Sequence, residues 1–172
     1  MKRIQIFSVL CLLTAAMDAT AQAGPGLAMP SDFNFVFQYE HGHILDTSKG
    51  TFTRDGAIPT SSLTVTMKLT AMEMEDIYHG LVSIDFWNNS KYPEVFTITP
   101  KGSGILVSPA GTDYRLRVTS NGAVKQLRWE DKIIEHYQPA EELREVFKRI
   151  RLIIESTPEY KNLPPSQVKY IN

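Results

Sequence analysis

An Asn-Gly pair, Asn121-Gly122, separates two runs of alternating apolar and polar residues in the second half of the chain. This dipeptide is a preferred centre for the two-residue turn that joins antiparallel strands, because both turn positions take positive φ. A two-residue loop pairs Ser120 with Ala123 and sets the register of a hairpin over residues 113–129. The facing pairs are then Val118 with Lys125, Leu116 with Leu127, Arg115 with Arg128 and Tyr114 with Trp129. This register puts nearly all the large apolar side chains on one face, the pattern of a sheet with one buried side.

Further alternating segments predict more strands of the same sheet, because side chains at every second position face the same side. Aromatic side chains occupy alternate positions of residues 33–40, which makes that strand a core element. A Ser-Lys-Gly turn ending at Gly50 links the next two strands. The remaining expected strands are residues 44–47, 51–54, 63–69, 94–99 and 104–107.

Two helices are expected. Thr70 and Glu73 have the spacing of a capping box and open the first helix, and the apolar stripe of residues 140–156 indicates the second, which Pro158 ends. The order strands, helix, strands, helix predicts an α+β fold. We expect an antiparallel sheet with two helices packed on one face, in a single domain over residues 32–163.

The first 23 residues have the features of a cleaved signal peptide: a basic start, an apolar stretch and the small residues Ala21 and Ala23 before the cut. We therefore expect an exported protein, periplasmic or secreted. Residues 24–31 then form a flexible N-terminal segment and residues 164–172 a C-terminal tail. Cys11 is the single cysteine of the chain and lies in the leader.

A mature domain without cysteine has neither disulfides nor a thiolate nucleophile, and about 150 residues can bury a core without such staples. The formal net charge of the chain is −1, so it lacks the strong positive field of nucleic-acid-binding domains. No second apolar run is long enough to span a bilayer. We expect no cofactor, no nucleic acid and no integral membrane segment after signal cleavage.

One resemblance runs along the first half of the domain. The chain contains Phe35-x-Phe37-x-Tyr39-x-x-Gly42, then Leu45-Asp46-Thr47-x-x-Gly50-Thr51-x-Thr53-x-Asp55, then a helix that reaches Ile77-Tyr78 and Ile84-Asp85-Phe86. This pattern resembles small uncharacterised secreted bacterial proteins, whose common plan covers residues 33–163. The resemblance implies a bacterial exported domain and carries no catalytic residue.

Two chemical alternatives are open. His41 and His43 are two positions apart, so in an extended chain their imidazoles share a face and could hold a metal ion. A small hydrolase would need only two carboxylates at a suitable distance. The acidic candidates for it are Glu73, Glu75, Asp76, Asp85, Glu130 and Asp131. Asp46 stands in a sequence similar to that of aspartic proteases, but Ser48 replaces their glycine, so we interpret it as a turn residue.

The feature that we weight most is a set of arginines on the polar face of the hairpin. Arg115, Arg117 and Arg128 share that face, with Arg115 directly opposite Arg128. Facing like charges are unfavourable unless an anion neutralises them. Glu94 is the expected internal candidate, and an anionic partner is the external one. The sequence thus favours a non-catalytic exported binding module, whose target is a protein or an envelope component.

Overall fold

The computed structural model describes residues 28–40, 42–54, 62–98, 107–133 and 136–164. Its strands form one seven-stranded sheet in the order β4-β3-β2-β1-β6-β7-β5. All neighbouring strands are antiparallel except β5, which runs parallel to β7. The strands are β1 (Asn34–Tyr39), β2 (His43–Asp46), β3 (Thr51–Arg54), β4 (Leu63–Thr66), β5 (Val95–Phe96), β6 (Val107–Ser120) and β7 (Ala123–Ile133). The predicted α+β class is therefore confirmed.

The hairpin of β6 and β7 has the predicted register. Ser120 pairs with Ala123, Leu116 with Leu127, and Arg115 with Arg128. Asn121 and Gly122 have φ values of 52° and 72°, as a turn of two left-handed residues requires. The buried face of this hairpin consists of Tyr114, Leu116, Val118, Leu127 and Trp129.

The other strands differ from expectation mainly in length. The predicted strand 63–69 ends at Thr66. The Met67 N–H still donates to Gly50 O at 2.9 Å, one pair further along the register of β3 and β4, and Thr70 then caps the next helix. Of the predicted strand 94–99, Val95–Phe96 is a strand. Most of the candidate strand 104–107 lies outside the described residues.

Helix α1 (Ala71–Ser83) begins where the capping box predicts. The Glu73 carboxylate accepts from the Thr70 N–H at 2.7 Å, and the Thr70 hydroxyl accepts from the Glu73 N–H at 3.3 Å. Helix α2 spans Gln138–Ser156. A short third helix, α3 (Pro158–Lys161), was not expected. Pro158 ends α2 as predicted, and its ring then suits the first turn of α3, which has Thr157 as its cap.

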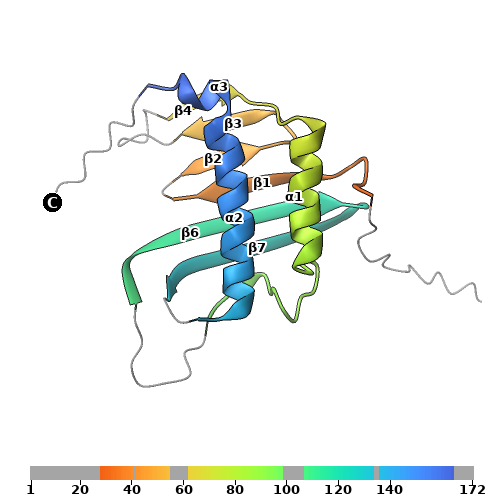
Figure 1. Cartoon of the computed structure of the whole chain (residues 1–172), viewed down its shortest axis with the longest axis vertical. Helices are drawn as coiled ribbons and strands as arrows, with labels where there is room; N and C mark the ends of the chain where they lie inside the picture. Colours follow the sequence, from red (N-terminus) through yellow and green to blue (C-terminus); the bar gives the residue numbers. More distant parts are fainter. Residues whose placement is uncertain (1–27, 41, 55–61, 99–106, 134–135, 165–172) are drawn as a thin grey trace, which may run out of the picture.

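The core lies between the strands and the two long helices. Phe147 of α2 lies 5.1 Å from Phe37 of β1 and 4.8 Å from Tyr114 of β6, measured between ring centroids. On α1, Tyr78 lies 5.1 Å from Phe33. In Figure 1 both helices lie in front of the strands, and α2 crosses the middle of the sheet. Arg115, Arg117 and Arg128 alternate with the buried residues of the hairpin and so lie on the opposite side of the sheet, whereas Lys125 and Asp131 lie on the side of the helices.

Candidate functional site

The three predicted arginines do share one exposed face of the hairpin. Arg115 and Arg117 are exposed on β6, and Arg128 is exposed on β7. Arg115 faces Arg128 directly, and Arg117 lies two residues further along β6 toward the turn. In an antiparallel pair such positions are about 4.5–7 Å apart between Cα atoms. We call these three residues the arginine face.

The pairing of β6 with β1 adds neutral neighbours to the arginine face. Val36 lies beside Arg117, and Gln38 lies beside Arg115. On β7 Gln126 lies opposite Arg117. Glutamine amides add donors without adding charge. The hairpin pattern did not reveal Val36 and Gln38, because no local signal states which strand lies beside β6.

No carboxylate in the described part of the chain forms an ion pair with the arginine face. Glu94, the expected internal partner, accepts the backbone N–H of Arg128 at 2.7 Å through its carbonyl oxygen, and no ion pair joins the two side chains. The next pair along the hairpin is Asp113 with Glu130, and Glu130 contacts Lys132. Asp113 and Glu130 thus lie on the same face as the arginines, two residues from Arg115 and Arg128, but no ion pair joins them to the arginine face among the described residues.

The histidine pair is described only in part. Nδ1 of His43 lies 3.3 Å from a carboxylate oxygen of Glu40. That distance suits an ion pair, but the geometry is not that of a hydrogen bond. His41 lies outside the described residues. Within the described ranges no cluster of three His, Cys, Asp or Glu side chains has metal-binding geometry.

Asp46 is a turn residue, as its sequence context indicates. Its carboxylate accepts from the Ser48 hydroxyl at 2.6 Å and from the Ser48 and Lys49 N–H groups at 3.1 Å and 3.2 Å. Burial tends to raise the pKa of Asp46, but these hydrogen bonds and the Lys49 ammonium outweigh it and lower the pKa. The carboxylate is therefore held in its charged form and completes a turn.

Most of the acidic candidates for a hydrolase form structural contacts within the fold. Glu73 belongs to the capping box of α1. Asp76 pairs with Arg149 at 2.8 Å and so joins α1 to α2. Asp131 accepts two bonds from the guanidinium of Arg144, at 2.8 Å and 2.6 Å, and so ties β7 to α2. The carboxylate of Asp85 accepts from the Asn88 amide at 3.0 Å.

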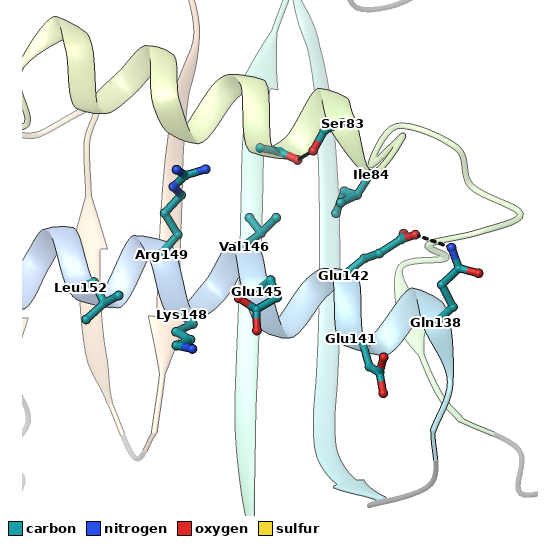
Figure 2. A pocket seen from close by; sticks show the side chains of 11 residues that line it. Ser83, Ile84, Gln138, Glu141, Glu142, Glu145, Val146, Lys148, Arg149 and Leu152 are labelled. Carbon is teal, nitrogen blue, oxygen red and sulfur yellow. Dashed lines mark hydrogen bonds between the residues drawn. The ribbon is translucent and has the colours of Figure 1, made fainter.

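A groove of about 700 Å³ lies between α1 and α2. Figure 2 shows Val146, Glu142 and Arg149 directed from α2 toward α1, whereas Lys148 and Glu141 point away from it. Arg149 is the partner of Asp76 across this seam. Arg149 and Glu142, the charged side chains directed toward α1, both have partners within the protein, so we interpret the groove as a helix–helix seam.

Sequence reasoning missed the role of Glu142 at one end of this groove. Its carboxylate lies 2.6 Å from the Lys91 ammonium and accepts from the hydroxyl of the fully buried Tyr92 at 2.5 Å and from Gln138 at 3.0 Å. Burial raises the pKa of Glu142, but the bonds from Lys91, Tyr92 and Gln138 outweigh it and lower the pKa. A carboxylate held charged in this way is a poor general acid. Tyr92 is 50 residues away from Glu142 in sequence and Lys91 is next to Tyr92, so no local pattern predicts these contacts.

No helix among the described residues combines the length and the hydropathy needed to cross a membrane. Comparison of the chain with protein-family models, with curated proteins and with solved structures gives no match. The function is therefore argued from the geometry of the described residues.

Proposed function

We propose that this chain is an exported, non-catalytic binding module that captures an anionic partner through the arginine face. The observation that supports this function most is the facing pair Arg115 and Arg128, with Arg117 beside it, without an ion-pair partner among the described residues. Guanidinium groups bind carboxylates and phosphates through fork-shaped pairs of donors. An anion removes the repulsion among the three charges, so binding gains from an arrangement that is already in place.

The proposal includes the architecture that presents this face. Both long helices cover one face of the sheet within a single domain, which leaves the opposite face to the partner. The signal peptide of residues 1–23 directs the domain out of the cytoplasm. A periplasmic or extracellular target then is another protein or an anionic component of the cell envelope.

The first test reverses one charge. Arg117→Glu should leave the protein folded and weaken its binding to poly-glutamate and to inorganic polyphosphate by about tenfold or more. The loss should shrink as salt is added, because exposed charges are screened. Isothermal titration calorimetry at two salt concentrations measures the affinity, and circular dichroism measures the melting temperature.

Lys148→Glu is the matched control, because it makes the same change in net charge at an exposed position on α2. It should leave polyanion binding unchanged. If Arg117→Glu binds both polyanions as well as the unmodified protein does, the arginine face is not the binding site. A lower melting temperature with unchanged binding would assign the arginines to internal pairing.

Export is tested separately. Expression of the full chain in a bacterial host should yield a secreted protein that begins at Gly24 or at Gln22, as intact mass spectrometry would report. Recovery of the chain from the membrane fraction with Met1 still present would contradict export by a cleaved leader.

A further inference from the structure

The edge of β7 next to the arginine face is open along half of the hairpin. Strand β5 covers β7 only at Arg128 and Trp129. From Ala123 to Leu127, β7 has β6 on one side, and no described strand lies on the other. An open edge presents backbone donors and acceptors that can pair with another chain.

The hydrogen-bond alternation identifies which backbone groups face outward. Arg128 donates its N–H to Glu94 O at 2.7 Å, away from β6, so Arg115 and Arg128 are a pair without mutual backbone hydrogen bonds. Such pairs alternate along an antiparallel ladder. Gln126 and Val124 therefore also direct their N–H and C=O groups away from β6, toward the open edge. None of these four groups has a hydrogen-bond partner among the described residues.

The surroundings of this edge are hollowed and partly apolar. A cavity of about 260 Å³ lies against it, with walls from Trp87, Asn89 and Glu94 and from residues 123–126 of β7. On the outer face Val124 is 50% exposed and Val95 is 61% exposed. Exposed apolar side chains therefore lie on both sides of the position at which a further strand could form backbone hydrogen bonds with β7.

We infer that an extended acidic peptide adds to this edge as a further strand of the sheet. This inference rests on the proposed function, because it identifies the anionic partner as a peptide and places its backbone. A peptide residue opposite Gln126 puts its side chain on the outer face, at a diagonal of about 7–8 Å from Arg128. A glutamate at that position reaches the Arg128 guanidinium and the Gln126 amide. The next outer position lies beside Val124 and suits an apolar residue.

The probe is the capped peptide Val-Thr-Glu-Thr-Val-Thr-Glu-Thr, which alternates outer and inner residues. One matched peptide carries Gln in place of Glu, and a second carries N-methyl groups on alternate backbone amides. The unmodified peptide should bind more tightly than either, by about tenfold, because one control removes the charge and the other the backbone donors. Arg128→Gln should weaken the Glu peptide and leave the Gln peptide unchanged.

Exchange of backbone amide hydrogens, measured by NMR, distinguishes strand addition from binding through side chains alone. Peptide binding should slow exchange of the Val124 and Gln126 amides by about tenfold or more, while Lys125, whose amide already pairs with β6, stays protected in both states. The N-methylated peptide should give no such protection.

Three results would overturn the inference and leave the proposed function standing. In the first, the peptide binds through the arginines but does not protect the Val124 and Gln126 amides from exchange. In the second, polyphosphate binds through the arginines and the peptide does not bind. In the third, both amides are already protected in the free protein, because another segment of the chain occupies the edge. Absence of binding by every polyanion would instead contradict the proposed function itself.

Discussion

Asp32 connects two parts of the chain that are distant in sequence. Its carboxylate accepts the backbone N–H of Asn121 at 2.9 Å and that of Gly122 at 2.7 Å. These bonds, the one from Gly122 first, lower the pKa of Asp32 although the side chain is exposed. The Asp32 carboxylate, in the segment before β1, thus holds both residues of the Asn121-Gly122 turn at the tip of the hairpin.

Asp32→Ala should lower the melting temperature and speed hydrogen exchange of the Asn121 and Gly122 amides, because both lose their acceptor. Asp113→Ala is the control, since Asp113 is exposed and accepts no such pair of backbone bonds from the described residues. Equal exchange rates at the turn in the two variants would contradict this role of Asp32.

At the scale of the element, β6 separates two surfaces of different composition. Leu116 is 1% exposed and belongs to the core, whereas Arg117, the next residue, is exposed on the opposite side. A shift of the register by one residue would exchange the two faces and place guanidinium groups against α2. The register of the Asn121-Gly122 hairpin is therefore a condition both for the fold and for the proposed binding site.

Leu116→Ala should destabilise the protein by about 2–5 kcal/mol, because it leaves a cavity in a packed core. Arg117→Ala on the same strand should change the free energy of unfolding by less than about 0.5 kcal/mol. Denaturant titration followed by tryptophan fluorescence measures both. Similar losses in the two variants would contradict the assignment of faces.

For the whole molecule, three carboxylates accept hydrogen bonds that hold turns or join separate segments. Asp32 holds the hairpin tip, Asp46 holds the turn after β2, and Glu142 joins α2 to Lys91 and Tyr92. The pKa of each is lowered in the folded state. A lowered pKa means that the folded state favours the charged form, so this stabilisation is full above the unfolded pKa, about 4, and is lost below it.

The melting temperature should therefore fall as the pH is lowered through about 4 toward 2. Asp46→Asn should be less stable than the unmodified protein at neutral pH and should lose less stability on acidification, because one titrating group has been removed. Scanning calorimetry over that pH range measures both effects. An unchanged acid dependence in the variant would exclude Asp46 as a contributor.

Local chemistry in the sequence was enough to predict several features of the fold. The Asn121-Gly122 turn predicted the pairing from Ser120 with Ala123 outward, and the spacing of Thr70 and Glu73 predicted the start of α1. Both signals act within a few residues, where backbone preferences decide the conformation. The face shared by Arg115, Arg117 and Arg128 follows from the same register.

Only the tertiary structure decided which elements lie beside this hairpin. β1 pairs with β6 and brings Val36 and Gln38 next to the arginines. β5 pairs with β7 over two residues, so that among the described strands Gln126 has a neighbour only on the β6 side. Alternation states which face a side chain occupies but not which strand is its neighbour. That choice depends on how the apolar faces of all strands and helices pack together, so it is a property of the whole core and not of any one segment.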